Sequence, residues 1–340
     1  MRAIGYAGST SPDDPRPLVD VDLPLPQPRS RDLLVRVDAL AVNPVDLKVR
    51  QRESPPPGQW RVLGWDATGR VDGVGDGVEG FQLGDRVWYA GALDRPGCNS
   101  EWHLVDERLV ALAPRNLSDA EAAALPLTSI TAWELLFDRL KLRPESTAHQ
   151  GEVLLVVGAA GGVGSILIQL AMALTGITVV ATASRPESER WLRELGVSWV
   201  INHGQPLLPQ LQALGFDGAG WVVSLTHTAQ HFDALVELLH PQGALALIDD
   251  PDPAAINVLA LKRKSLSLHW ELMFTRSLYG TPDMAQQGRI LQQVSQLVEQ
   301  GLIRTTLQRQ LAPIAAATLE EAHALQRSQR MVGKVVVAGW

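Results

Sequence analysis

The pattern of hydrophobic residues changes about 150 residues into the chain. Before that point, short stretches alternate between hydrophobic and polar residues, and proline- and glycine-rich turns such as PLPQP and GVGDGVEG separate them. The stretches are LLVRVDALAV, RVDGV, DRVWYAG and HLVDERLVAL. Alternation with a period of two is typical of strands that bury one face. The first part of the chain therefore predicts an antiparallel, barrel-like β domain.

A helical stretch follows, with the sequence LSDAEAAALPLTSITAWELLFDRL. Ser118 stands directly before its first hydrophobic positions, and Glu121 follows three residues later. This spacing is that of a capping box, in which both side chains bond the free backbone groups at a helix start. We expect a helix to begin at this point.

From about residue 151, strands and helices alternate. VLLVV precedes SILIQLAMAL, ITVVATA precedes ESERWLRELG, WVIN precedes PLLPQLQALG, GWVVSL precedes AQHFDALVELL, and ALALID closes the series. This alternation predicts a doubly wound parallel sheet of the Rossmann type, and therefore an α/β fold. SLSLHWELMF is expected to add a strand at or near the edge of that sheet.

The end of the chain returns to short strands. A long amphipathic helix around MAQQGRILQQVSQLVEQG is followed by a strand (TTLQRQLA), a helix (LEEAHALQR) and a strand (GKVVVAGW). We expect this tail to pack on the first domain. The predicted organisation is a discontinuous catalytic domain, residues 1–127 and 275–340, around a nucleotide-binding domain, residues 128–274.

One uncharged stretch, from Val153 to Ser184, is long enough to cross a bilayer. Glycines cluster early in it, and β-branched residues lie at both ends. Two buried strands joined by a glycine turn and a helix explain this pattern better than a membrane span does.

The composition is that of a soluble globular protein. Hydrophobic residues make up 46% and charged residues 20% of the 340 residues. The formal net charge of −7 disfavours nucleic acid or an anionic membrane as the main partner. The single cysteine, Cys98, excludes an internal disulfide and a four-cysteine zinc lobe. The first residues, MRAIGYAGSTSPDDP, lack the pattern of a signal peptide, so we expect a cytoplasmic protein.

The strongest chemical motif is a glycine-rich turn directly after the VLLVV strand. It contains Gly158, Ala160, Gly161, Gly162, Val163 and Gly164 and leads into a helix. Small residues let the backbone approach a pyrophosphate, whose charge lies at the helix N-terminus. In this context the motif predicts a dinucleotide site. A glycine turn without a ligand and an S-adenosylmethionine site are the alternatives.

The next strand ends without the acidic residue that would bind the ribose 2′-hydroxyl of NAD. Ser184 and Arg185 stand there instead, and Arg190 follows one helical turn later. A hydroxyl and guanidinium groups suit a 2′-phosphate, which no carboxylate would repel. We therefore predict NADP(H), with a solvated loop arginine as the alternative for Arg185.

Several longer stretches resemble a known family. AVNPVD (41–46), LPLT (125–128) and TAW (131–133) resemble the quinone oxidoreductase (zeta-crystallin-like) branch of the medium-chain dehydrogenase/reductase superfamily. GWDATG (64–69), ATASRPES (181–188) and KRKSLSLHWELMFTRS (262–277) resemble its "zinc-type alcohol dehydrogenase-like" subgroup. The resemblance covers essentially the whole chain. It implies an oxidoreductase with a GroES-like catalytic domain beside the Rossmann domain.

The residues argue against a catalytic zinc, despite the name of that subgroup. Zinc alcohol dehydrogenases carry a cysteine where this chain has Asn43, and Gly-His-Glu where it has Gly64, Trp65 and Asp66. Asparagine and tryptophan are poor zinc ligands, and Asp66 alone cannot replace three protein ligands. We therefore expect no metal at this position.

Two other clusters have a metal interpretation that we consider weaker. His227 and His231 are four residues apart, but no glutamate lies between them, and contact with the cofactor or a polar role at a helix start are the other interpretations. The carboxylates of Asp249, Asp250 and Asp252 follow a strand, where loop and cap roles are expected.

Without zinc, the expected reaction is hydride transfer from NADPH to a quinone or an α,β-unsaturated carbonyl compound. Hydrogen-bond donors must then stabilise the negative charge on the carbonyl oxygen. The resemblance places Asn43 beside the nicotinamide, and Lys48 is a second candidate donor. An asparagine that caps a turn and a surface lysine are the alternatives. Related reductases often have a tyrosine about ten residues after this asparagine; this chain has none there, so the proton donor stays open.

Further contacts follow from the ends of the predicted strands and from the resemblance. Thr131 is expected on the nicotinamide side of the cofactor, and the substrate is expected to meet Trp65, His269 and Trp270. A helix-interior hydroxyl that bonds the preceding turn is the alternative for Thr131, and a packed core aromatic is the alternative for Trp270. The remaining predicted cofactor contacts are Ser224, Leu225, Thr226, Ile248 and Lys334.

Two functions compete with a zinc-free reductase: an NADPH-binding sensor or structural protein with little turnover, and, less favoured, a zinc alcohol dehydrogenase. Pairing of the SLSLHWELMF edge strand across a two-fold axis would protect that edge, which predicts a homodimer.

Overall fold

The computed structural model describes residues 1–8, 16–145 and 147–340. The chain forms two compact units. Unit 1 contains Met1–Ile130 and Phe274–Trp340, and unit 2 contains Thr131–Met273. Part of the N-terminal sequence used for the cytoplasmic prediction, residues 9–15, lies outside the described residues.

Unit 2 is built on a parallel sheet. Its strands are β9 (Val153–Val157), β10 (Thr178–Thr182), β11 (Trp199–Ile201), β12 (Ala219–Ser224), β13 (Leu239–Leu247) and β14 (Ser267–Trp270). They lie in the order β11-β10-β9-β12-β13-β14, and every neighbouring pair is parallel. This order is that of a doubly wound Rossmann sheet. The predicted α/β fold is confirmed, and β14 lies at the sheet edge as expected.

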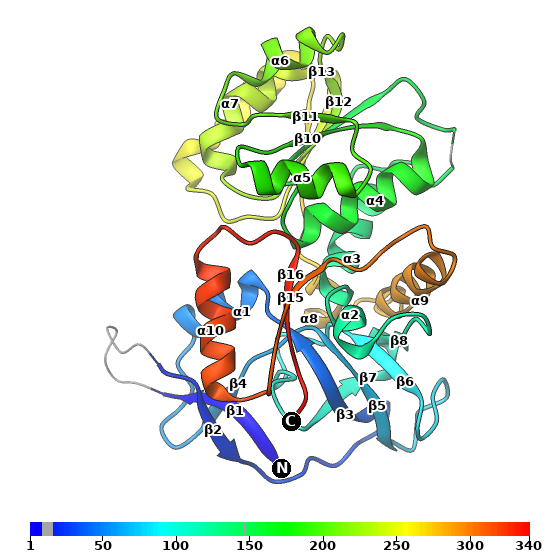
Figure 1. The fold of residues 1–340 in the computed structure, drawn as a ribbon, viewed down its shortest axis with the longest axis vertical. Helices are drawn as coiled ribbons and strands as arrows, with labels where there is room; N and C mark the ends of the chain where they lie inside the picture. Colours follow the sequence, from blue (N-terminus) through cyan, green and yellow to red (C-terminus); the bar gives the residue numbers. More distant parts are fainter. Residues whose placement is uncertain (9–15, 146) are drawn as a thin grey trace. The chain divides into compact units, whose positions relative to one another are not determined.

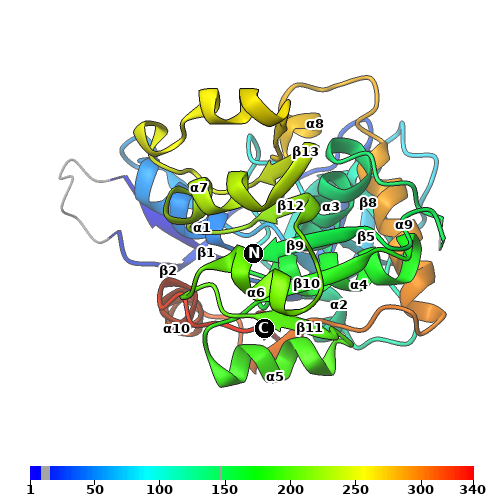
Figure 2. The ribbon, with the colours of Figure 1, turned by 90° about the horizontal axis from the view of Figure 1, so that it is seen from above.

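Helices precede and connect these strands. They are α3 (Pro126–Trp133, which begins in unit 1), a π-helix (Glu134–Arg139), α4 (Gly162–Thr175), α5 (Pro186–Glu194), α6 (Leu207–Ala213) and α7 (Thr228–Leu238), with 3-10 turns at Pro253–Ala255 and Val258–Lys264. Figure 2 shows β9, β10 and β12 side by side with α7 close to β12. In the described residues, no helix is long and apolar enough to cross a membrane. The uncharged stretch is divided into β9, α4 and β10, as the glycine cluster predicted.

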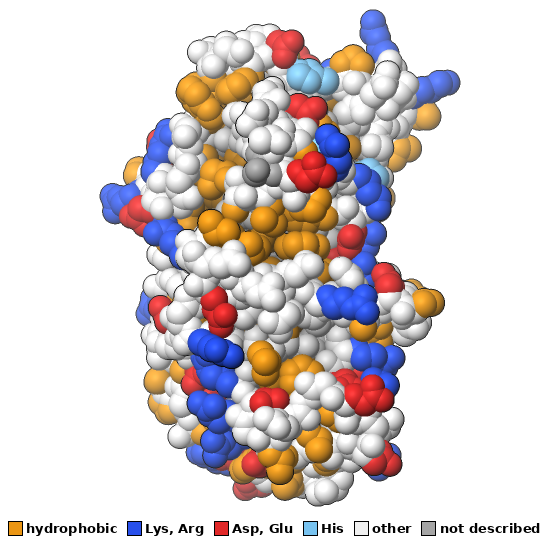
Figure 3. Space-filling model, turned by 90° about the vertical axis from the view of Figure 1, so that its right-hand side faces the viewer, with side chains coloured by type: hydrophobic (Ala, Val, Ile, Leu, Met, Phe, Trp, Pro, Cys, Tyr) orange, Lys and Arg blue, Asp and Glu red, His pale blue; other side chains and the backbone are white. Residues whose placement is uncertain are grey.

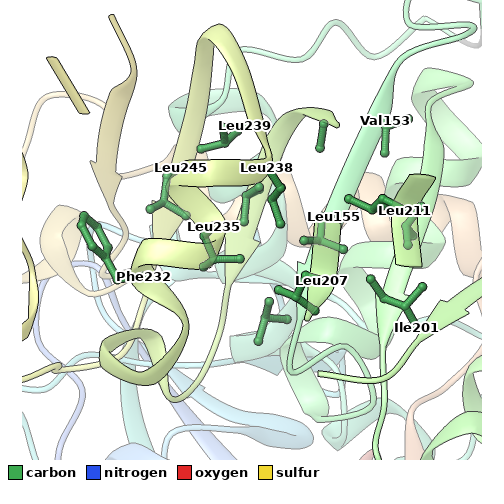
Figure 4. Packing of buried hydrophobic residues seen from close by; sticks show 14 of the residues in the cluster. Val153, Leu155, Ile201, Leu207, Leu211, Phe232, Leu235, Leu238, Leu239 and Leu245 are labelled. Carbon is green, nitrogen blue, oxygen red and sulfur yellow. The ribbon is translucent and has the colours of Figure 1, made fainter. Parts of the chain in front are cut away.

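A hydrophobic core joins α6 and α7 to the sheet. Leu211 of α6, Leu235 of α7 and Leu155 of β9 are all completely buried in this cluster (Figure 4). On α4, Ser165 Oγ accepts a hydrogen bond of 2.8 Å from the indole Nε1 of Trp191 on α5. These contacts hold the helices against the strands, so that the loops at the carboxyl ends of the strands stand on a rigid base.

Unit 1 contains two sheets. The smaller consists of β1 (Arg2–Ala7), β2 (Val19–Asp22) and β4 (Trp60–Val62) in the order β2-β1-β4. The larger has the order β15-β16-β3-β5-β6-β8, and β7 also pairs with β3. Its strands are β3 (Asp32–Ala41), β5 (Ala67–Val74), β6 (Arg86–Tyr89), β7 (Trp102–Asp106), β8 (Val110–Leu112), β15 (Leu307–Leu311) and β16 (Lys334–Ala338). Apart from the parallel pair β15–β16, neighbouring strands are antiparallel.

The last strand of the chain lies beside one of the first. β16 pairs antiparallel with β3, with Val336 opposite Ala41 (Figure 1). The helices of unit 1 are α1 (Pro44–Arg52), α2 (Asp119–Ala123), α8 (Thr275–Leu278), α9 (Gln286–Glu299) and α10 (Ala316–Arg327), with a 3-10 turn at Glu107–Leu109. α2 begins at the capping box that the sequence predicted, because Ser118 Oγ accepts from the N–H of Glu121 and the Glu121 carboxylate accepts from the N–H of Ser118.

Charged side chains of both signs share the surface. On the face drawn in Figure 3, Lys and Arg side chains lie among Asp and Glu side chains. The acidic excess of the sequence, 37 Asp and Glu against 30 Lys and Arg, is thus not gathered into one acidic area on that face.

Candidate functional site

The glycine turn between β9 and α4 needs small residues at two positions. Gly158 has φ +78°, and a Cβ there would lie 2.9 Å from Cγ2 of Thr226. At Gly164, a Cβ would lie 2.4 Å from the carbonyl oxygen of Ala159. The first glycine therefore permits the turn and the last permits close packing of α4. Gly161 is the N-cap of α4, so no side chain covers the first N–H groups of the helix, and they can bind an anion.

The ends of β12 and β13 are tied together beside this turn. The Thr228 N–H donates to Asp249 Oδ2 at 2.9 Å, and its hydroxyl donates to Asp249 Oδ1 at 2.6 Å. Ser224 and Thr228 share a further hydrogen bond of 2.8 Å between their hydroxyls. Asp249 thus caps the start of α7, and Asp252 caps the Pro253–Ala255 turn by accepting from Ala254 N–H. The structural role expected for these aspartates is confirmed.

Basic side chains gather where β10 and β11 end. Ser184 and Arg190 are exposed, while Arg185 is half-buried at the N-cap of α5. His203 follows β11, and its Nδ1 lies 3.2 Å from the hydroxyl of Thr182. Burial lowers the pKa of His203, and the positive charges of other histidines and of Arg185 lower it further. Sequence reasoning missed His203, although its position two residues after a strand in the Rossmann pattern was a usable signal.

His227 and His231 are not arranged as their spacing suggested. His227 has φ +53° and precedes α7, so the two rings do not share one helix face. His231 instead lies edge-to-face with His203, with ring centres 5.9 Å apart. Burial, followed by the charge of His227, lowers the pKa of His231. The three rings form a histidine group at the carboxyl edge of the sheet.

The other predicted contacts of unit 2 are spread along the same edge. The N–H of Leu225 donates to the carbonyl oxygen of Val157 at 3.1 Å, which fixes Leu225 beside the glycine turn. Ile248 follows β13 and is half-buried. On β14, Trp270 is 51% exposed. Burial lowers the pKa of His269, as do the positive charges of Arg139 and Lys141.

Thr131 lies in α3, and its side chain is buried. α3 continues into the π-helix Glu134–Arg139, where the N–H of Leu140 bonds the carbonyl oxygen of Leu135 five residues earlier. Short π-helical turns often occur at functional sites. Nothing in the sequence pattern distinguished this turn from the α-helical residues before it.

Unit 1 contains a buried polar cluster that draws on distant parts of the chain. Its members are Asn43, Asp46, Asp66 and Lys334, none more than 4% exposed. Asn43 is the N-cap of α1, and its N–H donates to Asp46 Oδ2 at 2.8 Å. The second oxygen of Asp46 accepts from the N–H of Gly64 at 2.9 Å. We call this group the Lys334 cluster.

Lys334 and Asp66 form its centre. Lys334 Nζ donates to Asp66 Oδ2 at 3.0 Å and also to the amide oxygen of Asn43. The Asn43 amide nitrogen donates to the same Asp66 oxygen at 2.8 Å. The other oxygen of Asp66 accepts from the N–H of Leu127 at 2.7 Å. Every polar group of the Asn43 side chain is therefore engaged.

Burial controls the titration of this cluster. It raises the pKa of Asp46 to about 7, against the opposing effect of its two backbone donors and of Lys334. Burial also raises the pKa of Asp66, while Lys334 is the largest influence that lowers it. The pKa of the Cys98 thiol is raised as well, because Cys98 is buried near both carboxylates. Cys98 is thus a neutral thiol rather than a reactive thiolate.

Two further predicted residues of unit 1 lie near this cluster in the sequence. Trp65 is 1% exposed, its indole N–H donates to the carbonyl oxygen of Ala92 at 3.1 Å, and its ring lies edge-to-face with that of Phe274. Lys48 is half-buried on α1. Their predicted roles in substrate binding and catalysis stay predictions.

Comparison with known proteins identifies the family. Residues 29–114 match the model of the alcohol dehydrogenase GroES-like domain, and residues 195–337 match that of zinc-binding dehydrogenases. A zinc-type alcohol dehydrogenase-like protein of Staphylococcus epidermidis is 36% identical over 99% of both chains. The chain belongs to the medium-chain dehydrogenase/reductase superfamily. This superfamily member is thus an oxidoreductase with a GroES-like domain, as the sequence motifs predicted.

Other relatives of this medium-chain dehydrogenase/reductase carry more specific names. A putative zinc-dependent alcohol dehydrogenase from Rhizobium etli is 50% identical, covers 100% of this chain and 98% of its own, and has a TM-score of 0.94. The quinone oxidoreductase of Coxiella burnetii is 25% identical with a TM-score of 0.80, covering 100% and 99%. The 2-methylene-furan-3-one reductase of Solanum lycopersicum is 37% identical over 60% of this chain and 52% of its own.

The relatives named as zinc-type or zinc-dependent alcohol dehydrogenases imply a zinc ion, but Trp65 and the residues of the Lys334 cluster do not fit one. Trp65 offers only an N–H, which already donates to a carbonyl. The Asn43 amide is engaged by Asp66 and Lys334, and a positive ammonium lies 3.0 Å from the Asp66 carboxylate. A catalytic zinc needs three nitrogen, sulfur or carboxylate ligands. The residues that the structure describes contain no group of three or more His, Cys, Asp or Glu suited to a metal ion.

Proposed function

We propose that this protein is an NADPH-dependent reductase that transfers a hydride to a quinone or an α,β-unsaturated carbonyl compound without zinc. The observation that supports the proposal most is the combination of two features at one sheet edge. One is a glycine turn whose Gly158 and Gly164 leave no room for a Cβ, and the other is the guanidinium of Arg185, whose charge acts on the nearby ring of His203. Together they suit a dinucleotide that carries an additional phosphate.

The cofactor would be held along the carboxyl edge of the sheet in unit 2. Its pyrophosphate would lie on the residues of the glycine turn, which are Gly158, Ala160, Gly161, Gly162, Val163 and Gly164. Its 2′-phosphate would meet Ser184, Arg185 and Arg190, and its nicotinamide half would meet Ser224, Leu225, Thr226 and Ile248. This assignment follows from the strand order, because the dinucleotide crosses the sheet where that order reverses, between β9 and β12. When bound, NADPH supplies the hydride.

Conjugated acceptors suit a site without a Lewis acid. Their conjugation makes hydride addition easier than it is for a simple ketone, so hydrogen-bond donors suffice for the developing oxyanion. The tomato relative is named for reduction of such a conjugated ketone, and the Coxiella neighbour for reduction of quinones. We retain Asn43, Lys48 and Thr131 as the proposed catalytic residues, with water as the proton source.

A second candidate function is favoured by one observation. The side chain of Asn43 is buried, and both its amide nitrogen and its oxygen have partners within the Lys334 cluster. An asparagine held in this way is poorly suited to donate to a substrate oxygen. An NADPH-binding protein with little turnover is therefore the alternative to a reductase.

A panel of acceptors separates these functions. Cyclohexenone and p-benzoquinone should oxidise NADPH in the presence of the protein, whereas cyclohexanone should not. Asn43→Ala should lower kcat about 10²-fold with little change in NADPH affinity, since a lost oxyanion donor has an effect of this size. Tight NADPH binding without turnover of any acceptor would establish the binding protein instead. Cyclohexanone reduction that a chelator abolishes would establish a zinc alcohol dehydrogenase.

We also propose a homodimer. β14 is the edge strand of its sheet, and Trp270 on that strand and Leu259 in the preceding turn are 51% and 76% exposed. Exposed strand edges with large hydrophobic side chains are usually covered by a partner. Light scattering at micromolar concentration should give twice the chain mass, and a monomer would refute the dimer.

A further inference from the structure

We propose that Lys334 is the resident cation of unit 1: its ammonium group takes the position that a metal ion would need, and it fixes the orientation of the Asn43 amide. Lys334 is then a positioning residue rather than a cofactor ligand. The activity part of this inference rests on the proposed function, but the structural part does not.

The ammonium group is fully coordinated by oxygen atoms. Lys334 Nζ bonds the carbonyl oxygen of Val42 at 3.0 Å, Oδ1 of Asn43 at 2.5 Å and Oδ2 of Asp66 at 3.0 Å. An ammonium has three hydrogens, and each has one acceptor here. The three oxygens form a binding site for a cation of this size, which we call the oxygen tripod.

The backbone conformation around Lys334 directs its side chain toward the tripod. The preceding residue, Gly333, has φ +58°, and a Cβ there would lie 2.4 Å from the carbonyl oxygen of Thr306. The N–H of Lys334 donates to that same carbonyl oxygen at 2.8 Å. Only glycine fits at position 333, and it sets the start of β16 so that Lys334 faces the cluster.

Charge explains why a cation is needed here. Asp46 and Asp66 are buried to 1% and 0% exposure, and a buried carboxylate without a counterion is strongly unfavourable. Among the described residues, Lys334 is the one cation with a direct hydrogen bond to either of them. A metal ion bound by the same three oxygens would overlap the ammonium group, which already occupies that position. The lysine and a metal therefore exclude each other.

The same contacts leave Asn43 a single orientation. Lys334 can only donate, so it faces the amide oxygen, and an ionised Asp66 can only accept, so it faces the amide nitrogen. Rotating the amide by half a turn would place donor against donor and acceptor against acceptor. Lys334 and Asp66 thus fix which atom of Asn43 points in which direction.

Chemical rescue tests the tripod without relying on turnover. In Lys334→Ala, the tripod loses its cation, and we expect Tm to fall by roughly 10 °C, as for a broken buried ion pair. Methylammonium should restore part of this loss, because it fits the space and has three N–H groups. Tetramethylammonium has none and should not. The wild type and the control Lys262→Ala, which changes an exposed lysine, should respond equally little to both salts.

Equal responses to both salts, or equal rescue in Lys262→Ala, would overturn the proposal. If Lys334→Ala does not fold, Lys334→Met and the double variant Lys334→Met/Asp66→Asn replace it. Removing both charges should then give a higher Tm than removing Lys334 alone. A double variant that is no more stable than Lys334→Met would contradict the inferred charge pairing.

Kinetics separate positioning from cofactor binding. If Lys334 positions Asn43, Lys334→Met should lower kcat and leave the KM for NADPH nearly unchanged, and Lys334→Arg should not restore kcat because its planar group does not fit the tripod. A raised KM for NADPH with normal kcat would assign Lys334 to the cofactor and overturn the positioning role. A protein without turnover in any variant would refute the proposed function. The rescue of Tm would still test whether the ammonium of Lys334 is the cation that the tripod holds.

Discussion

Lys334 Nζ lies 3.0 Å from Oδ2 of Asp66, although 268 residues separate them in the sequence. Both side chains are almost completely buried. The contact joins the start of the last strand to the loop before β5, and it lies among residues at which zinc dehydrogenases are expected to hold their metal. The ion pair accounts for both the stability of the cluster and its poor fit to zinc.

The pH dependence of stability tests the state of Asp46. Its pKa is about 7 in the folded protein and 3.8 without the fold. A carboxyl whose pKa is raised by folding stays protonated to a higher pH in the folded protein. Its favourable contribution to the free energy of unfolding is therefore complete below pH 4 and is lost as the pH rises to 7. Asparagine does not titrate, so Asp46→Asn does not lose this stability as the pH rises. The free energy of unfolding of the variant relative to wild type should therefore increase from pH 5 to pH 8, as measured by urea unfolding.

Because other groups also titrate in this range, only the difference between the two proteins is informative. Burial lowers the pKa of His103 and His323 to about 4, which makes the wild type more stable as the pH rises to 6.5. Those histidines are unchanged in Asp46→Asn, so their effect cancels. A difference that does not vary with pH would mean that Asp46 is ionised throughout.

Close packing at the glycine turn predicts the effect of one methyl group. In Gly164→Ala, the new Cβ would lie 2.4 Å from the carbonyl oxygen of Ala159, and α4 must move away from the turn. We expect a loss of about 1–3 kcal/mol in the free energy of unfolding and weaker NADPH binding. Gly220→Ala is the matched control, since no atom lies within 4 Å of its Cβ position. Equal unfolding curves for the two variants would refute the packing argument.

Arg185 is predicted to distinguish NADPH from NADH. Arg185→Ala removes a guanidinium from the proposed 2′-phosphate site, so the Kd for NADPH should rise about tenfold or more while that for NADH stays constant. Isothermal titration of both cofactors measures this directly. Arg263→Ala, which changes an exposed arginine elsewhere in unit 2, controls for the loss of net charge. An unchanged Kd for NADPH would remove Arg185 from the site.

His203 is predicted to make NADPH binding depend on pH. Its pKa in the protein is lowered by burial first, and then by His231, His227 and Arg185. A phosphate dianion nearby would raise that pKa, so NADPH binding should take up a proton and become tighter as the pH falls from 8 to 6. His203→Gln should weaken this dependence, and NADH binding should lack it. Identical pH profiles for wild type and variant would exclude His203 from the phosphate site.

The sequence was most informative where local pattern decides structure. The alternation of VLLVV, SILIQLAMAL and ITVVATA predicted β9, α4 and β10. Hydrophobic residues recur along a strand with a different period from that along a helix. Ser118 and Glu121 likewise predicted the start of α2, because a capping box is a local arrangement. The family could be recognised for a related reason, since its motifs are long and continuous.

Contacts between distant segments could not be predicted in this way. Lys334 was assigned to the cofactor by resemblance, and only the pairing of β16 with β3 brings it next to Asn43 and Asp66. His203 reaches the neighbourhood of Arg185 because β11 lies beside β10. The spacing of His227 and His231 was misleading, because His227 adopts a left-handed conformation outside the helix. Each of these results depends on strand order or backbone conformation rather than on local spacing.

The central claim is that the protein transfers a hydride from NADPH without a metal. It is tested most directly by measuring the zinc content and the kcat of a single chelator-treated preparation, with p-benzoquinone and with NADPH or NADH as the donor. Full activity at far less than one zinc per chain, with NADPH preferred over NADH, is the predicted result. Activity that disappears with the chelator and returns in proportion to added zinc would contradict the account.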